Sequence, residues 1–202
     1  LTVVLLVIGI AVLVMAVSAV ARRTPEYYVE QGHGHYAAGQ YEQALTGYVR
    51  ALELDPNLPE AENGAGQSYL RLGQIGMAIP HLNKAVSLNP ELVDAHRGLG
   101  VAYSRAGMNV EAEASLKSAL KLAENDLESM RYLGQVLYQE RRYEEAVELL
   151  EQVTGQRGDD AVALEYLGRA QYATGAFHKA VDALQEALAL ARALDHAFSL
   201  AD

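Results

Sequence analysis

The pattern of hydrophobic and polar positions changes once along the chain, near residue 22. Residues 1–21 contain no charged side chain. From residue 25 onward, apolar residues recur at spacings of three and four between charged and amide residues, which is typical of amphipathic helices. We therefore predict one wholly apolar helix followed by a series of amphipathic helices.

The apolar segment has the length of a membrane-spanning helix. Twenty-one helical residues reach about 30 Å, which is the thickness of the hydrocarbon core of a bilayer. The residues Ala19, Val20 and Ala21 also resemble the small-residue cleavage site of a secretory signal peptide. Because the apolar run is longer than a usual signal core, we expect a retained single-pass anchor at residues 1–21.

The flanking charges bear on which side of the membrane the rest of the chain lies. Arg22 and Arg23 belong to a short juxtamembrane linker, residues 22–24, and the positive-inside rule places this flank in the cytoplasm. The chain does not begin with Met, so we expect further sequence before Leu1. Lys or Arg residues there would reverse the orientation, and an extracytoplasmic location stays open.

A repeat of 34 residues follows the apolar segment. Five series of residues keep this spacing without an insertion. They are Gly32, Gly66, Gly100, Gly134 and Gly168; Ala44, Ala78, Ala112, Ala146 and Ala180; Ala51, Ala85, Ala119, Val153 and Ala187; Tyr48, Leu82, Leu116, Leu150 and Leu184; and Gly39, Gly73, Gly107, Arg141 and Gly175. A period of this length indicates stacked repeats of helices.

Each repeat is predicted to form two helices. The first carries small and apolar residues on one face, such as Leu99, Gly100 and Tyr103, and its glycine allows a neighbouring helix to approach closely. A turn follows, with a glycine at the position that needs a left-handed backbone. The second helix buries alanines and a leucine, and Pro25 and Pro59 open their repeats at a position where a missing N–H does no harm.

This pattern resembles the tetratricopeptide repeat family. The matching residues include Tyr28, Leu99, Gly100, Tyr103, Ala112, Pro56 and Pro90, and the stretch GQYEQALTGYVRALELDPN at residues 39–57. The resemblance implies an all-α fold, in which a right-handed α-solenoid of five helix-turn-helix repeats follows the transmembrane helix. The repeats would span residues 25–58, 59–92, 93–126, 127–160 and 161–194, and residues 195–202 would form a short tail.

The chain departs from the repeat pattern at a few positions. Arg141 replaces the turn glycine of the fourth repeat, where a left-handed backbone costs about 1 kcal/mol for a residue with a side chain. Glu124, Gly158 and Arg192 replace the closing proline. Pro80 lies inside a second helix, and we expect a mild kink there, softened by Gly76.

The stretch QGHGH at residues 31–35 invites a comparison with metal sites. His33 and His35 are two residues apart, so on a helix they point to different faces, whereas a chelating pair is spaced by three or four. The chain has no cysteine, and it contains no G-x-S-x-G motif or phosphate-binding loop. We predict no catalytic residue, no cofactor and no metal, and therefore not an enzyme.

Function is expected on the concave surface that stacked helix pairs create. In proteins resembling this one, the first helices line that surface. The residues on the corresponding face are His33, Tyr36, Asn63, Gln67, Arg71, Arg97, Arg105, Arg131, Gln135, Tyr138, Arg169 and Tyr172, with Val29, Leu70, Val101, Ser104, Gln139 and Glu165 beside them. We call these residues the predicted groove.

The predicted groove is richer in arginine than the chain around it. The net charge of the whole chain is −10, which argues against nucleic acid as a partner. Arginine presents a planar fork for carboxylates, so one hypothesis is that the groove binds an acidic or C-terminal peptide segment of a partner. The alternative is that the arginines pair with Glu60, Asp94 and Glu128 and leave a neutral surface.

The last second helix raises a further expectation, because repeat arrays usually end in a polar capping helix. The stretch HKAVDALQEALALARAL at residues 178–194 would leave apolar surface open, for docking or for self-association. The alternative is that Phe198 and Leu200 fold back over it.

These features predict a membrane-anchored scaffold for protein–protein interaction, an accessory or assembly subunit of a larger membrane protein complex. Its partners would be subunits of that complex, and the lipid bilayer through residues 1–21. Two alternatives stay open, a peptide adaptor and an assembly or maturation factor that binds client proteins transiently.

Overall fold

The computed structural model describes residues 24–199, and the side chains of residues 24–193. The predicted membrane-spanning segment, residues 1–21, lies outside the described residues. Within the described range, no helix combines the length and the apolar character that crossing a bilayer requires. The fold can therefore be compared with the sequence from residue 24 onward.

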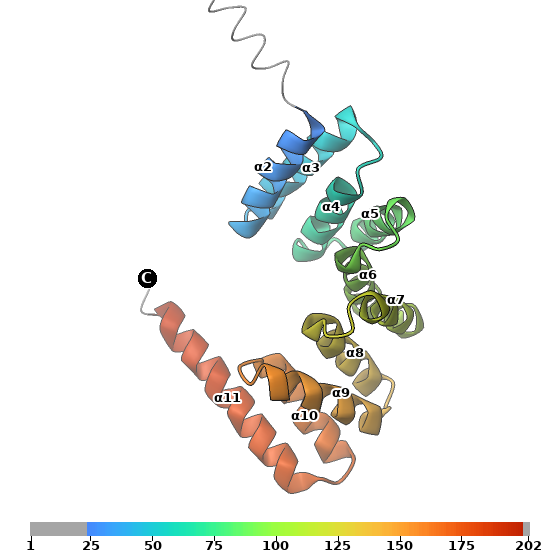
Figure 1. Ribbon diagram of the computed structural model, residues 1–202. Coiled ribbons are helices and arrows are strands. Elements are labelled where there is room, and N and C mark those ends of the chain that lie inside the picture. The colour runs from blue at the N-terminus through green and yellow to red at the C-terminus, as the bar shows by residue number, and fades with distance from the viewer. Residues whose placement is uncertain (1–23, 200–202) are drawn as a thin grey trace, which may run out of the picture. The chain divides into compact units, whose positions relative to one another are not determined.

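The described chain is all-helical, with alternating first and second helices (Figure 1). The first helices are α2 (Pro25–Ala37), α4 (Pro59–Arg71), α6 (Val93–Arg105), α8 (Leu127–Gln139) and α10 (Ala161–Ala173). The second helices are α3 (Tyr41–Leu54), α5 (Ile75–Leu88), α7 (Asn109–Leu122), α9 (Tyr143–Gln156) and α11 (Phe177–Ser199). The prediction of an all-helical solenoid with two helices per repeat is confirmed.

The helices form two compact units, which are described separately. Unit 1 comprises residues 1–88, of which the structure describes α2 to α5, and unit 2 comprises residues 89–202 with α6 to α11. Within each unit a first helix packs against the second helix of its own repeat, and α4, α8 and α10 also pack against the second helix of the preceding repeat.

The glycine of each first helix gives room for a large side chain of the second helix. A Cβ added to Gly100 would lie 2.4 Å from Cγ of Leu116, and one added to Gly134 would lie 2.6 Å from Cγ of Leu150. Leu116 and Leu150 are fully buried. The close approach predicted for these glycines is confirmed, and the partner is the large residue sixteen positions later.

In the first repeat, a tyrosine fills the space beside the glycine that a leucine fills in the later repeats. Tyr48 occupies the position that leucine has in later repeats, and it is fully buried. Its ring would contact a Cβ at Gly32 (2.6 Å), and also one at Gly64 of the next first helix (2.4 Å). Burial raises the pKa of the Tyr48 hydroxyl, so this ring stays neutral.

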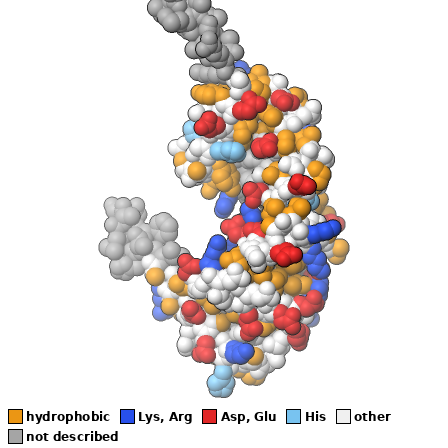
Figure 2. All heavy atoms as spheres, in the orientation of Figure 1, with side chains coloured by type: hydrophobic (Ala, Val, Ile, Leu, Met, Phe, Trp, Pro, Cys, Tyr) orange, Lys and Arg blue, Asp and Glu red, His pale blue; other side chains and the backbone are white. Residues whose placement is uncertain are grey.

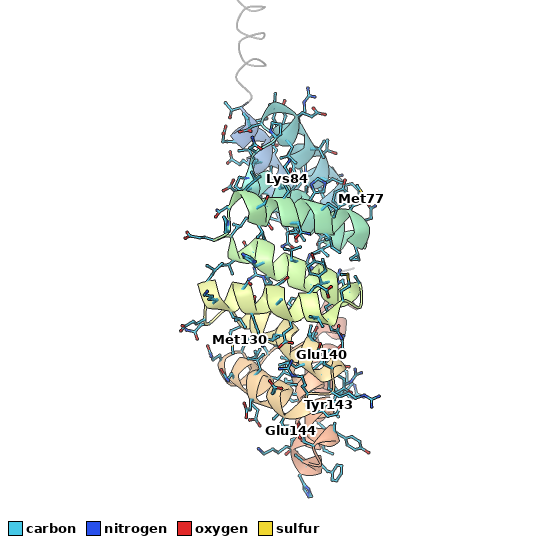
Figure 3. All side chains as sticks on the ribbon, turned by 90° about the vertical axis from the view of Figure 1, so that its right-hand side faces the viewer. Met77, Lys84, Met130, Glu140, Tyr143 and Glu144 are labelled. Atoms are coloured by element: carbon cyan, nitrogen blue, oxygen red, sulfur yellow. The ribbon has the colours of Figure 1, made fainter. Side chains whose placement is uncertain are left out.

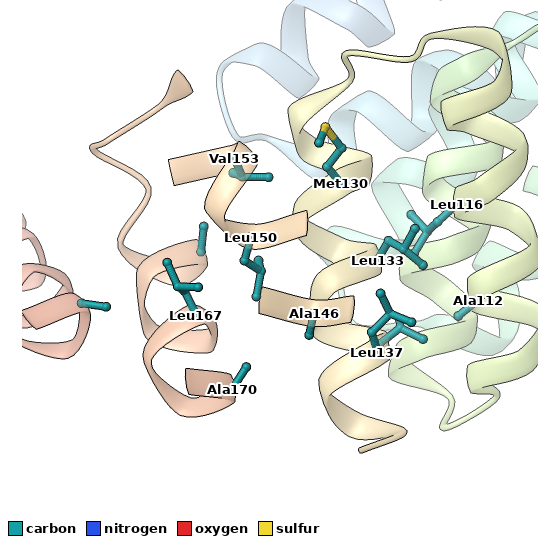
Figure 4. Packing of buried hydrophobic residues seen from close by; sticks show 13 residues of the cluster. Ala112, Leu116, Met130, Leu133, Leu137, Ala146, Leu150, Val153, Leu167 and Ala170 are labelled. Carbon is teal, nitrogen blue, oxygen red and sulfur yellow. The ribbon is translucent and has the colours of Figure 1, made fainter. Parts of the chain in front are cut away.

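The core of unit 2 is built from the faces that the repeat pattern indicates (Figure 4). Ala146, Leu150 and Val153 of α9 pack in one cluster with Leu167 and Ala170 of α10. The same cluster continues through α8 to Leu116 of α7. The second helices α7 and α9 are therefore sandwiched between their own first helix and the next one.

Helix starts follow the expected chemistry. Pro25 and Pro59 occupy the first turn of α2 and α4, as predicted. Side chains of Thr24, Asp126 and Asp160 cap α2, α8 and α10 by accepting a backbone N–H of the first turn. Pro80 lies within α5, which runs through it from Ile75 to Leu88, and the kink stays a prediction.

The turn between the two helices of a repeat has a left-handed residue each time. The φ angles are 73° at Gly39, 73° at Gly73, 76° at Gly107 and 84° at Gly175. Arg141 has a φ of 62°. Figure 3 labels Glu140, at the end of α8, and Tyr143, the first residue of α9. The left-handed backbone predicted for these five positions, including the arginine, is confirmed.

Because Arg141 has a side chain in a left-handed backbone, Arg141→Gly should raise the free energy of unfolding by about 1 kcal/mol. Urea titration followed by circular dichroism measures the change. The reciprocal variant Gly107→Arg, at the same turn position of the preceding repeat, should lose a similar amount. A loss of stability in Arg141→Gly would contradict the strain argument.

Candidate peptide-binding surface

The predicted groove of unit 2 lies on α6, α8 and α10. Three of its arginines form ion pairs with acidic residues. Arg97 Nη1 donates to both carboxylate oxygens of Asp126, at 2.8 and 2.7 Å. Its Nη2 donates to Asp94, and its Nε lies 3.3 Å from Glu128. Arg97 is therefore the centre of a four-residue charge cluster.

Asp126 is also the N-cap of α8, so Arg97 connects two successive first helices. Oδ2 of Asp126 accepts the backbone N–H of Ser129 at 3.2 Å, and it also accepts the Ser129 hydroxyl. Burial raises the pKa of Asp126, but the bonds from Ser129 and Arg97 outweigh it and hold the pKa below its usual value. The carboxylate is thus ionised at neutral pH and holds the start of α8.

A similar ion pair lies one repeat later, although its Arg131 Nε makes no hydrogen bond within the described residues. Arg131 Nε lies 3.2 Å from Oδ2 of Asp160, which caps α10 through the backbone N–H of Ala163. The Arg131 guanidinium also lies over the ring of Tyr132, 4.3 Å from its centroid. We call Arg97–Asp126 and Arg131–Asp160 the repeat clasps, because each joins a first helix to the cap of the next.

These contacts decide between the two interpretations of the arginines for most of unit 2. Arg169 Nη2 lies 2.6 Å from Glu165 on the same helix, so Arg97, Arg131 and Arg169 all have acidic partners. The alternative of paired arginines is favoured at these three positions. The predicted partners Asp94 and Glu128 are correct, while Asp126 and Asp160 were not predicted.

An aromatic surface accompanies the arginines on α8 and α10. The ring of Tyr138 lies 5.5 Å from that of Tyr143 and 5.6 Å from that of Tyr166. Tyr172 is 65% exposed, and its ring meets Phe177 edge-on at 5.3 Å. Gln135 is half-buried, and Gln139 and Arg105 are exposed. This part of unit 2 offers rings and amides to a partner.

In unit 1 the predicted groove residues lie on α2 and α4. The Tyr36 hydroxyl accepts from Nε of Arg71 at 3.1 Å. His33 packs edge-on against Tyr48, with ring centroids 5.5 Å apart. Asn63 and Gln67 are half-buried, and Oδ1 of Asn63 is buried without a hydrogen-bond partner within the described residues.

Two residues predicted beside the groove are wrong for that role. Leu70 and Val101 are 4% and 8% exposed. Leu70 stands where three other repeats have Tyr36, Tyr138 and Tyr172, and Val101 stands where others have His33, Gln67 or Arg169. Long polar side chains at these positions reach the surface, whereas a short apolar side chain stays buried.

A cleft in unit 1 was missed by the sequence reasoning. Its volume is about 880 Å³, and it is lined chiefly by Tyr27, Tyr28, Gln31 and His35 of α2 and by the facing residues of α3, including Arg50. His35 Nδ1 lies 2.7 Å from Oε1 of Gln40. The signal was present in Gln31, because later repeats have alanine or leucine at that position.

Histidine and carboxylate contacts elsewhere are structural. Glu62 is 2% exposed, and its carboxylate lies 2.6 Å from both His81 Nδ1 and Lys84 Nζ. The Tyr69 ring stacks on His81 at 5.3 Å. Across the part of the chain that the structure describes, no group of three or more His, Asp or Glu residues could hold a metal ion.

Two family models match the chain. The model described as TPR repeat matches residues 32–73 and 66–107. The model described as anaphase-promoting complex, cyclosome, subunit 3 matches residues 111–187. A search of curated protein sequences gave no match.

Solved structures of repeat proteins are similar to most of this chain. The crystal structure of MamA protein is 25% identical, with a TM-score of 0.69, and the match covers 83% of this chain and 92% of that one. YrrB, "a TPR protein with an unusual peptide-binding site", is 27% identical, with a TM-score of 0.66 and coverage of 81% and 84%. A thermophilic TPR protein from Thermus thermophilus is 23% identical with a TM-score of 0.68 and coverage of 84% and 92%, and it shows the fold alone. The TPR repeat model, over residues 32–107, and these structures together support the resemblance of this chain to the tetratricopeptide repeat family.

Proposed function

We propose that this chain is a scaffold that binds peptide segments of other proteins on the first helices of unit 2, and that residues 1–21 hold it at a membrane. Tetratricopeptide repeat proteins mediate protein–protein interactions. The description of YrrB as a TPR protein with a peptide-binding site supports the proposal that this chain also binds peptide segments.

The observation that carries the proposal is the exposure of Tyr172. A tyrosine that is 65% exposed offers a large contact area at a low cost in conformational entropy. Arg169, whose guanidinium lies 5.5 Å from the ring centroid of Tyr166, stands one turn before Tyr172. Together with Tyr138 and Gln139 they form a surface of rings and hydrogen-bonding groups.

The repeat clasps change which peptide we propose. Arg97 and Arg131 have side chains that are 20% and 15% exposed and are paired with carboxylates. A partner carboxylate would have to displace Asp126 or Asp160 and uncap a helix. We therefore propose recognition through aromatic and amide contacts, with a secondary part for an acidic or C-terminal group at Arg169, whose exposed pair with Glu165 can be displaced without uncapping a helix.

The membrane part of the proposal depends on the 21 uncharged residues at the start of the sequence. An anchor raises the local concentration of the binding surface near membrane partners, which makes weak contacts effective. We propose an accessory or assembly subunit of a membrane protein complex, with Arg22 and Arg23 favouring the cytoplasmic side. An assembly factor that binds clients transiently would instead leave no stable complex.

Tyr172→Ala should reduce the recovery of co-purifying subunits about tenfold, since loss of one exposed aromatic anchor costs about 1.4 kcal/mol or more. The measurement is native purification of the tagged full chain in mild detergent, with quantification of each co-eluting protein. Val110→Ala is the matched control, because Val110 is 74% exposed on the second helix α7. Equal recovery from both variants would contradict the proposed surface.

The same preparation tests the other parts of the proposal. Recovery that falls steeply with salt would assign recognition to carboxylates instead of rings and amides. Ile10→Arg with Val14→Arg should move the chain from the membrane fraction to the soluble fraction, because each arginine opposes membrane insertion by about 3 kcal/mol. An unaltered chain found in the soluble fraction would contradict the anchor.

A further inference from the structure

The last second helix exposes a row of apolar side chains. Phe177, Val181, Leu184 and Leu188 are spaced by four, three and four along α11, and they are 55%, 53%, 36% and 50% exposed. We call these four residues the α11 stripe. The open apolar surface predicted for this helix is present. Since α11 runs to Ser199, its backbone does not fold back over the stripe before that residue.

The same four positions are covered in the preceding repeat by the next first helix. In α9 the corresponding residues are Tyr143, Val147, Leu150 and Thr154, and all are buried or half-buried. Leu150, at the position of Leu184, is 0% exposed and packs in the cluster that contains Leu167 and Ala170 of α10 (Figure 4). The α11 stripe therefore has the composition of a surface that a helix covers.

The helices that cover such a row share a pattern. Three fully or nearly buried positions, spaced by four and three, face the preceding repeat. They are Ala61, Ala65 and Ser68 in α4, Ser129, Leu133 and Val136 in α8, and Ala163, Leu167 and Ala170 in α10. The small residue at the first position lets the helix axes approach, the middle position is alanine or leucine, and the third is serine, valine or alanine.

A second copy of this chain offers the wrong face for the α11 stripe. Among the described residues, the first helix without a preceding repeat is α2, where the three equivalent positions are Tyr27, Gln31 and Gly34, and all three are exposed. A bulky ring stands where the covering helices have alanine or serine, and a polar amide stands where they have alanine or leucine. The space-filling view shows hydrophobic, acidic and histidine side chains mixed on the surface of unit 1 (Figure 2).

The direction of α11 argues against a following segment of the same chain as the occupant. The second helices α3, α7 and α9 are 14 residues long and end in a short connection to the next first helix. Helix α11 has 23 residues and continues to Ser199, beyond Leu190, where the equivalent helices end. Helix α11 therefore continues at the point where the other second helices end in the short connection that leads to the next first helix.

We propose that the α11 stripe is the docking site for an amphipathic helix of a partner protein, which takes the place of the next first helix. That helix carries a small residue, alanine or leucine four residues later, and serine, alanine or valine three residues after that. This site differs from the proposed peptide-binding surface on α8 and α10, which it adjoins where Phe177 contacts Tyr172.

A peptide copy of α10 tests this directly. The probe is a fluorescent peptide with the sequence of residues 161–173, in which Arg169→Lys allows a lactam with Glu165, because an unconstrained helix of 13 residues is marginal in water. Glu165 and Arg169 lie on the outer face, where they pair. Fluorescence anisotropy with the full chain in mild detergent should show saturable binding.

Variants of the α11 stripe test whether the peptide binds there. Val181→Gln with Leu188→Gln should weaken the peptide at least tenfold, and these positions are exposed enough to leave the internal packing of α11 intact, which circular dichroism verifies. Val110→Gln with Leu122→Gln, on exposed apolar residues of α7, is the matched control. A probe with Ala163→Glu and Ala170→Glu should not bind. Gln139→Ala, on the α8 part of the proposed peptide-binding surface, should leave peptide binding unchanged, because α8 does not contact α11, and this separates the proposal from the proposed function.

Three outcomes would overturn the proposal. One is the absence of saturable binding, and another is binding that the Val181 and Leu188 changes do not affect. The third is a dimer in sedimentation velocity that disappears in the Val181→Gln and Leu188→Gln variant, because the occupant would then be a second copy.

Discussion

Replacing Gly134 by valine should lower the free energy of unfolding by about 3 kcal/mol, at the upper end of the cost of overpacking a core. A Cβ at this position would lie 2.6 Å from Cγ and 2.7 Å from Cδ2 of Leu150. Leu150 is fully buried between α8 and α10, so it has no free direction in which to move. The clash must be relieved by separating α8 from α9, and that exposes the cluster both helices share.

The same substitution at Gly155 is the matched control. Gly155 lies near the end of α9, and a Cβ there would meet nothing within 4 Å, so Gly155→Val should change stability by less than about 0.5 kcal/mol. In a Leu150→Ala background the loss caused by Gly134→Val should shrink by at least about 1 kcal/mol, since the two residues compete for one space. Additive effects in urea titrations would show that Gly134 acts through something other than Leu150.

The Gly134–Leu150 contact shows why much of this fold could be predicted from the sequence. Residues that recur every 34 positions must satisfy the same local geometry in each repeat. A glycine on an otherwise apolar helix face therefore indicated close packing, and Arg141 could be assigned a left-handed backbone from the glycines at its equivalent positions. The structure confirms both at the residues concerned.

The candidate site was less predictable because its contacts connect different repeats. The spacing of 34 between Arg97 and Arg131, and between Asp126 and Asp160, was visible. That each arginine forms an ion pair with the aspartate 29 residues later depends on how far one repeat is displaced from the next. The cleft at α2 was missed for a related reason, since its lining comes from α2, α3 and the turn after α4, and the repeat pattern does not give the spacing between those elements.

Removal of Asp126 tests the repeat clasps. Asp126→Ala should lower the free energy of unfolding by about 2 kcal/mol, of which about 1 is the lost N-cap of α8 and about 1 is the lost partner of Arg97. The Arg97 side chain is 20% exposed and keeps Asp94 and Glu128 as neighbours, so the loss stays below that of a fully buried pair. Asp126→Asn keeps a capping oxygen and should lose only the ionic part.

The dependence on pH separates the clasp from ordinary packing. Because the pKa of Asp126 is lowered in the folded chain, its contribution is fully present above the ordinary aspartate pKa of about 3.9. It disappears as the pH falls through the lower folded value. The stability difference between the unaltered chain and Asp126→Asn should therefore be constant near neutral pH and shrink below about pH 4.

The control is Asp159→Ala, at an exposed carboxylate beside the cap of α10. Its stability difference from the unaltered chain should not change in this way with pH. A gap between the unaltered chain and Asp126→Asn that persists unchanged to pH 2 would mean that Asp126 stabilises α8 without its charge, through hydrogen bonds of its neutral carboxyl group.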